Sequence, residues 1–212
     1  AQLGLSALDP DLIKPVLGLH PWWVLEHREQ ECWAALGELE ALLPAHPQVV
    51  ALGELGLDFF RDKTKDASGL QKAILGRQLV LASELGLPLV LHVVHAHEVA
   101  LEVLSAHQKK RGRPLQGLVH AFSGSYEIAQ EYLKLGLKLS VGPGLAEPGR
   151  HKQLKSAFVR LKPEDWVLES DGKGPELLRA AGAAALLLQK EVDWVLEHSS
   201  QNVAQVFKSL RK

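Results

Sequence analysis

Four short apolar runs in this chain each end in a side chain that can bind a metal ion. They are Val-Val-Ala-Leu-Gly-Glu54, Pro-Leu-Val-Leu-His92, Gly-Leu-Val-His120 and Trp-Val-Leu-Glu-Ser-Asp171. Runs rich in Val and Leu are typical of buried parallel strands, and the C-terminal ends of strands are where catalytic groups collect in a (β/α) barrel. One such strand means little. Four of them, carrying Glu, His, His and Asp in turn, predict a metal centre with nitrogen and oxygen ligands.

Strand-like and helix-like segments alternate along the chain, which predicts an α/β fold with a parallel sheet. Strands are expected at 15–19, 49–53, 89–92, 118–120, 137–141 and 166–169. Helices are expected at 29–43, 69–85, 97–108, 153–161, 177–190 and 199–210, with one more that is capped within 123–125 and ends at 135. These six strands are fewer than the eight of a closed TIM (β/α)8 barrel. We therefore expect a single barrel domain over 1–212 whose first one or two strands lie upstream of Ala1.

Composition limits the classes of protein to which this chain can belong. The chain has 212 residues, 46% of them hydrophobic and 23% charged, which allows a sizeable core. Its formal net charge of −1 means that nucleic-acid binding would need a local basic patch. The single cysteine, Cys32, excludes an intramolecular disulfide. The single cysteine also fits a reducing cytoplasm, where we expect the protein, and no apolar run approaches the roughly 18 residues of a membrane span.

Five motifs carry a resemblance to a known family. In chain order they are Gly18-Leu19-His20-Pro21, Leu52-Gly53-Glu54-Leu55-Gly56-Leu57-Asp58, Leu87-Pro88-Leu89-Val90-Leu91-His92, Val119-His120-Ala121-Phe122-Ser123-Gly124-Ser125 and Leu168-Glu169-Ser170-Asp171. The series resembles the TatD-related metal-dependent deoxyribonucleases of the amidohydrolase superfamily. The resemblance runs from about Val16 to Asp171 and resumes weakly around Gln201-Asn202-Val203-Ala204.

The resemblance implies a barrel that holds one to three divalent ions, and we expect two, of Mg, Mn or Zn. It implies Glu54, His92, His120 and Asp171 as metal ligands. Glu54 can bridge two cations, and Asp171 can take a proton from the attacking water. The implied reaction is hydrolysis of a phosphodiester in DNA, in the 3′ to 5′ direction on single strands. We expect a monomer.

Three departures from the family pattern are visible. The family opens with a His-x-His pair, which this chain lacks, and we expect that pair upstream of Ala1. The family usually carries an Arg where this chain has Val94, which cannot hold a phosphate. The segment Gly172-Lys173-Gly174-Pro175 replaces the usual Ala-Pro and substrate loop, so we expect omitted residues after Asp171.

Substrate contacts are expected from four side chains. Arg61 and Lys63 lie in a charged segment, 58–68, that follows the Glu54 strand, where they could meet phosphates. His20 follows the first strand and could contact the substrate or support a ligand, or simply shape a turn. His95 could approach the phosphate in place of the missing Arg. Alternatively, the His95-Ala96-His97 sequence could match the missing His-x-His motif without binding metal or substrate.

Each candidate also has a purely structural interpretation. Glu54 could form a salt bridge, and either ligand histidine could be a hydrogen-bonded core residue. Asp171 could cap the following helix. Glu169, two residues before Asp171, shares its strand face and could support a ligand or pair with a Lys. Trp22 and Trp23 could stack on bases or cover a helix end, while the basic segment 109–113 is expected to be a solvated turn.

Two other functions remain open from the residues. One is a metal hydrolase that acts on a small cyclic amide or ester, because a fold does not fix a substrate. The other is a degenerate barrel that acts as a binding protein, which the missing His-x-His pair and Val94 motivate.

Overall fold

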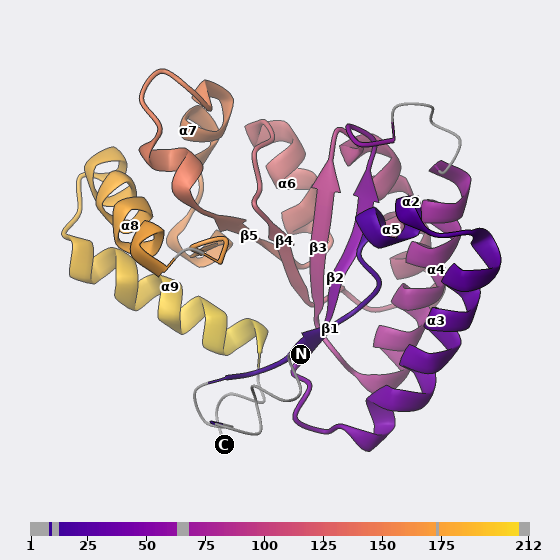
Figure 1. Ribbon diagram of the computed structural model, residues 1–212. Coiled ribbons are helices and arrows are strands. Elements are labelled where there is room, and N and C mark those ends of the chain that lie inside the picture. The colour runs from indigo at the N-terminus through magenta and orange to yellow at the C-terminus, as the bar shows by residue number, and fades with distance from the viewer. Residues whose placement is uncertain (1–8, 10–12, 63–67, 173, 208–212) are drawn as a thin grey trace. The chain divides into compact units, whose positions relative to one another are not determined.

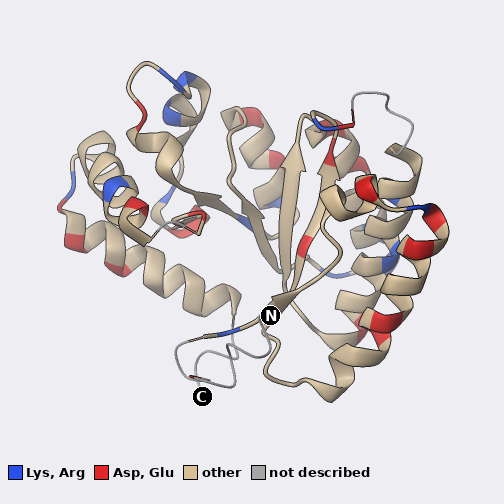
Figure 2. Cartoon of the chain, in the orientation of Figure 1, with Lys and Arg blue, Asp and Glu red and all other residues tan. Residues whose placement is uncertain are grey.

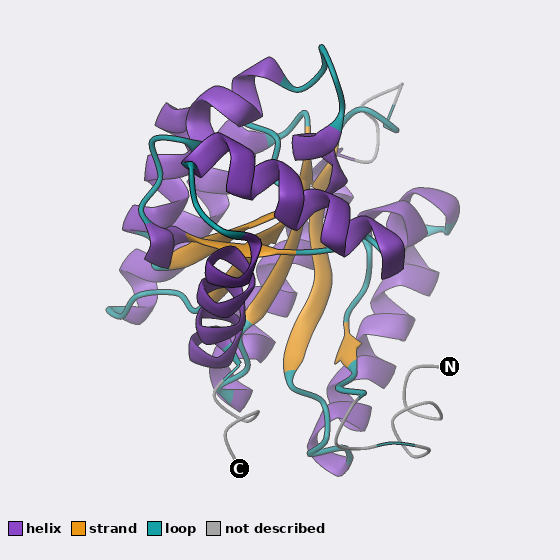
Figure 3. Ribbon diagram, turned by 90° about the vertical axis from the view of Figure 1, so that its left-hand side faces the viewer, coloured by secondary structure: helices purple, strands orange, loops and turns teal. Residues whose placement is uncertain are grey.

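The computed structural model describes residues 9, 13–62, 68–172 and 174–207. The chain divides into two compact units, 1–117 and 118–212. In both units parallel strands alternate with helices along the chain (Figure 1), so the fold class is α/β, as the sequence predicts. Within each unit the helices cover the strands (Figure 3), which explains why the strands are continuous apolar runs.

The sheet of the first unit consists of β1 (Val16–Leu17), β2 (Ala51–Asp58) and β3 (Leu89–Val94), parallel and in that order. Nearly every position of β2 is buried. The register between β2 and β3 shifts between Gly53 and Leu55, as in a β-bulge. The bulge lies at Glu54, so the local irregularity of the sheet coincides with the first candidate ligand.

Helices pack around this sheet. They are α2 (Pro21–Glu26), α3 (Glu29–Leu42), the 3₁₀ turn η1 (Leu43–Ala45), α4 (Ser68–Leu85) and α5 (His97–Arg111). Gly112 caps the C-terminus of α5 and has a φ of 67°, in the left-handed region that glycine tolerates. Val24, Cys32, Leu36 and Ile74 form one cluster of the core, so the single cysteine is a buried packing residue.

In the second unit the strand order is β4 (Gly117–His120), β5 (Leu137–Val141) and β6 (Trp166–Leu168). Its helical segments are α6 (Tyr126–Lys134), η2 (Pro143–Ala146), α7 (Lys152–Phe158), η3 (Pro163–Asp165), α8 (Gly174–Leu188) and α9 (Val192–Val206). The predicted cap of α6 is confirmed, because the Ser125 side chain accepts a hydrogen bond from the Ile128 amide. Trp166 and Phe158 are fully buried and form part of the core.

Four sequence expectations need correction. Strand β2 continues to Asp58 instead of stopping at Gly53, because Leu55 and Leu57 are buried and the ladder with β3 continues. Helix α2 was not expected; it starts at Pro21, a residue whose fixed φ suits the first helical turn.

The other two corrections concern helix ends. Residues 109–111 are the last turn of α5, not a loop, and their positive charges suit a helix C-terminus. Helix α9 begins at Val192, seven residues earlier than expected. In the part of the chain that the structure describes, no helix has the length and apolar character that crossing a membrane requires.

Candidate metal centre

The first half-site, as we call His20, Glu54, Asp58 and His92, lies in the first unit. Glu54 projects from the bulge of β2 and His92 from the neighbouring strand β3. Glu54 Oε2 lies 3.8 Å from His92 Nδ1 and 3.5 Å from His20 Nε2. Ligand atoms of His20, Glu54 and His92 all lie within 4.8 Å of one another, a spacing that can hold a metal ion.

Asp58 orients the His92 ring. Its Oδ2 atom lies 3.2 Å from His92 Nε2 and accepts a 2.6 Å hydrogen bond from the Trp22 indole. Burial opposes ionisation of Asp58, but hydrogen bonds from Trp22, the Arg61 amide and His92 outweigh it, so the pKa of Asp58 lies below its ordinary value. The ionised carboxylate can only accept, so His92 Nε2 carries a proton, and in the neutral ring Nδ1 presents its lone pair to Glu54.

His20 has a different role from His92. It occupies the N-cap position of α2, where its Nδ1 accepts a 3.1 Å hydrogen bond from the Trp22 amide. In a neutral imidazole the other nitrogen then carries the proton. His20 Nε2 therefore points an N–H group at Glu54 Oε2 and is a donor to a carboxylate or a substrate oxygen.

The second half-site, as we call His120, Ser140, Glu169 and Asp171, lies in the second unit. His120 ends β4, and its Nδ1 lies 2.8 Å from Glu169 Oε2, while its Nε2 lies 3.6 Å from Asp171 Oδ1. Glu169 also accepts hydrogen bonds from the Ser140 hydroxyl and, at 3.1 Å, from the Ala121 amide. With Nδ1 donating to Glu169, His120 Nε2 presents its lone pair to Asp171.

A pocket of about 410 Å³ adjoins the second half-site. Glu169 and Asp171 line it, together with Ser123, His151 and Arg179. Asp171 is the exposed member, with 63% of its side chain accessible, whereas His120 is 16% accessible. The carboxylate of Asp171 is therefore open to water and to a ligand in this pocket.

The structure thus brings the four predicted ligands together as two pairs, Glu54 with His92 and His120 with Asp171. In each pair a carboxylate oxygen faces an imidazole lone pair at less than 4 Å. A divalent cation between the two groups would be bound by both, as would a proton on the imidazole nitrogen. Neutral imidazole and carboxylate suit Zn, Mn or Mg, and a carboxylate behind the ring is a common support of metal-binding histidines. The donor set fits a divalent metal.

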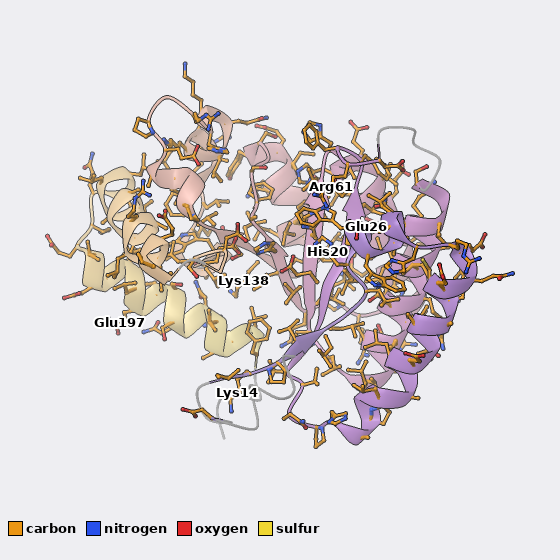
Figure 4. All side chains as sticks on the ribbon, viewed as in Figure 1. Lys14, His20, Glu26, Arg61, Lys138 and Glu197 are labelled. Atoms are coloured by element: carbon orange, nitrogen blue, oxygen red, sulfur yellow. The ribbon has the colours of Figure 1, made fainter. Side chains whose placement is uncertain are left out.

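The predicted substrate residues in the first unit lie near the first half-site. The Arg61 guanidinium carbon lies 3.9 Å from the centroid of the Trp22 ring, and Arg61 Nη1 lies 3.9 Å from Glu26 Oε1. Figure 4 labels His20, Glu26 and Arg61, which lie around the short helix α2. His95 is exposed with its ring 5.1 Å from that of Phe60, while Lys63 lies outside the described residues.

Sequence reasoning missed two residues that position the ligands. Asp58 was assigned to a loop, but it is 2% exposed and holds His92. Its position at the end of the Gly-Leu-Asp motif was the signal that could have identified it. Ser140 gave no signal, because a Ser inside an apolar strand is common; only the fold brings it to Glu169. Glu169 was expected as a possible support residue, and it does hold His120.

A family model described as TatD related DNase matches residues 3–208. The chain therefore belongs to the TatD-related DNase family. Among its relatives, the uncharacterized metal-dependent hydrolase YjjV of Escherichia coli is 35% identical over 156 residues, covering 73% of this chain and 56% of YjjV. The 3′-5′ ssDNA/RNA exonuclease TatD of Klebsiella pneumoniae is 34% identical over 156 residues, covering 73% of this chain and 55% of that protein.

The chain thus spans a little over half the length of these two TatD-family relatives. Among solved structures, the TatD homologue YjjV of Escherichia coli superimposes with a TM-score of 0.82 at 28% identity, covering 96% of this chain and 80% of that one. The fold is therefore that of the solved TatD homologues, as the sequence resemblance implied.

Proposed function

We propose that this chain is a metal-dependent phosphodiesterase that removes nucleotides from the 3′ end of single-stranded DNA. The proposal rests first on the two ligand pairs, in which a carboxylate-supported imidazole faces a second carboxylate (His92 with Glu54, His120 with Asp171). The names of the relatives support it further, since one is a metal-dependent hydrolase and another a 3′-5′ ssDNA/RNA exonuclease.

In this proposal Glu54 and His92 would hold a divalent metal ion in the first unit, and His120 and Asp171 would hold one in the second, two ions in all. Divalent ions lower the pKa of bound water and neutralise charge that builds on phosphate oxygens. Asp171 acts as the general base, because its carboxylate is the most exposed of the four ligands and adjoins a pocket. Glu54 Oε2 lies 3.8 Å from His92 Nδ1, so these two side chains would share a metal ion, while His20 donates to the same carboxylate.

Phosphate recognition falls to side chains of the first unit. The N–H group of His20 Nε2 points toward Glu54, so it can donate to an oxygen of a phosphate held at the same place. Arg61 supplies a positive charge near His20, and His95 and Lys63 complete the proposed set. These residues would offset the absence of an Arg at Val94, which lies at the end of β3.

The test is cleavage of a single-stranded DNA oligonucleotide with a 5′ label by the intact protein in Mg, Mn or Zn, with a parallel sample in chelator. The expected result is a ladder that shortens from the 3′ end and is absent in chelator. The matched control is Asp193→Asn, which removes an exposed carboxylate in the first turn of α9 and is expected to cleave like the wild type.

Absence of cleavage in every metal would contradict the proposal and favour a binding role or a small-molecule hydrolase. Cleavage that persists in chelator would contradict the metal dependence. An RNA strand of the same sequence, tested alongside, distinguishes a deoxyribonuclease from a nuclease of both nucleic acids.

A further inference from the structure

A group of exposed aromatic and charged side chains beside the first half-site takes no part in the ligand pairs. Trp22 and Phe60 are 40% and 66% exposed, although large apolar side chains are usually covered. Together with Leu25, Glu26 and Arg61 they line an open pocket of about 440 Å³. We call Trp22, Phe60 and Arg61 the aromatic platform.

The platform is held in place by the same residue that orients His92. The indole nitrogen of Trp22 donates to Asp58 Oδ2 at 2.6 Å, and the backbone amides of Phe60 and Arg61 donate to Asp58 Oδ1 at 3.0 and 2.9 Å. Arg61 lies over the Trp22 ring at 3.9 Å. These contacts fix the Trp22 indole and the backbone that carries Phe60 and Arg61 before any ligand arrives, which lowers the entropy that binding costs.

The platform adjoins the first half-site directly. The Trp22 ring centroid lies 4.9 Å from that of His20 and 5.7 Å from that of His92. The ring of Phe60 lies 5.1 Å from that of His95 on its other side. A ligand on the platform would therefore lie next to a phosphate held near His20 and Glu54.

We propose that the aromatic platform is a nucleobase-binding subsite for the nucleotide next to the cleaved phosphodiester. This inference rests on the proposed function and adds the part of the substrate that is recognised. A flat aromatic ligand matches the exposed Phe60 face, and bases stack on such rings with little sequence preference. Arg61 supplies positive charge for the strand's phosphates, while the pocket has the size of small-molecule sites.

Other occupants fit the same surface less well. A purely apolar peptide would leave the charges of Arg61 and Glu26 buried and imperfectly paired, because their nearest approach is 3.9 Å. A base with its phosphate combines a ring face with negative charge, which complements both the rings and Arg61.

The test is direct binding in chelator, so that no cleavage intervenes. Fluorescence anisotropy would compare a labelled oligothymidylate with a matched strand of abasic tetrahydrofuran sites, using the intact protein. Wild type should bind the base-containing strand about tenfold more tightly. Phe60→Ala should remove this preference and Phe60→Tyr, which keeps a flat ring, should restore it. Trp33→Ala removes an indole that is also 40% exposed, in the second turn of α3 and outside the pocket lining, and should keep the preference.

Equal affinity of wild type for the two strands, or a preference that survives Phe60→Ala, would overturn the subsite. The proposed function fails separately: a base preference that depends on Phe60, together with no cleavage in any metal, would support the subsite and overturn the nuclease.

Discussion

The two half-sites use the same arrangement with opposite ring nitrogens. In the first, Asp58 accepts from His92 Nε2 and leaves Nδ1 facing Glu54; in the second, Glu169 accepts from His120 Nδ1 and leaves Nε2 facing Asp171. A supporting carboxylate fixes the tautomer and orientation of an imidazole ligand. In both half-sites, therefore, an imidazole ring lies between a supporting carboxylate and a second carboxylate.

The half-sites differ in how far the second carboxylate is enclosed. Glu54 comes from inside strand β2 and has 37% of its side chain accessible, with His20 and His92 on either side. Asp171 follows β6 and is 63% accessible beside a pocket. Enclosure suits a fixed ligand, whereas access to water suits a base. Similar carboxylate–imidazole pairs can therefore differ in role because their surroundings differ.

Negative charge is concentrated on one helix of the first unit. Figure 2 shows acidic residues along α3, on the first unit, where Glu29, Glu31, Glu38 and Glu40 lie. This helix is an unfavourable surface for a DNA strand. Any strand that binds the first unit is expected to follow Arg61 instead.

The largest expected effect comes from the exposed carboxylate. Asp171→Asn should lower the cleavage rate by about 10²–10⁴-fold, because it removes the proposed general base. The melting temperature should stay within a few degrees, since the side chain is mostly exposed. Cleavage assays and calorimetry on this variant and on Asp193→Asn test the role. Wild-type activity of Asp171→Asn would remove Asp171 from the mechanism and break the proposed specialisation.

The supporting carboxylates should give the next largest effect. Asp58→Asn and Glu169→Gln should each weaken metal binding by about 10–100-fold, because an amide cannot fix the histidine tautomer as a carboxylate does. Calorimetric titration with Mn or Zn measures this loss. Glu131→Gln is the control, as its carboxylate pairs only on the surface with Lys134. Unchanged affinity in both variants would show that the supporting carboxylates do not act on the metal.

A smaller effect concerns acid stability of the first half-site. The folded-state pKa of Asp58 is lowered, so its stabilisation is complete above the unfolded value of about 3.9 and is lost as the pH falls through the folded value. Trp22→Phe removes one donor and should cost about 1.5–3 kcal/mol at pH 7, an extra cost that disappears in acid. Urea unfolding at pH 7 and at a pH below the folded-state pKa of Asp58 measures the difference.

The control for this acid effect is Trp33→Phe, whose indole donates to an exposed carboxylate of Glu29. That surface contact should contribute little at either pH. A destabilisation by Trp22→Phe that is the same at both pH values would mean that the indole does not stabilise ionised Asp58.

The smallest effect is expected at Ser140. Ser140→Ala removes one of the donors to Glu169, which keeps those from His120 and the Ala121 amide. The free energy of unfolding should fall by about 1 kcal/mol. Denaturant unfolding checks this, with Ser105→Ala, on the exposed side of α5, as the control. A loss equal to that of Glu169→Gln would mean that Ser140 alone holds the carboxylate.

The sequence predicted the α/β class and the positions of the strands because buried parallel strands leave uninterrupted apolar runs. It expected four ligand candidates at strand ends, but only His120 ends its strand; Glu54 and His92 lie inside β2 and β3, and Asp171 comes three residues after β6. It misplaced Asp58, because Gly56 inside β2 suggested a turn, whereas a bulge lets the ladder continue to the end of the strand. Ladder continuation depends on a partner strand, which local composition does not specify.

Supporting residues were harder to predict than ligands. Ser140 lies 29 residues from Glu169, and the Trp22 indole reaches Asp58 across 36 residues. Such long-range hydrogen bonds depend on which elements pack together, and neither residue type is diagnostic alone. Local composition likewise did not indicate that the Phe60 side chain is exposed.

The most direct test is anomalous diffraction from crystals of the intact protein grown with Zn or Mn. The account predicts an anomalous peak at the Glu54–His92 pair, at the His120–Asp171 pair, or at both, about 2.0–2.2 Å from the ligand atoms if the ion is Zn. It further predicts ligation through Nδ1 of His92 and Nε2 of His120. Peaks held by other residues, or none beside either ligand pair, would contradict it.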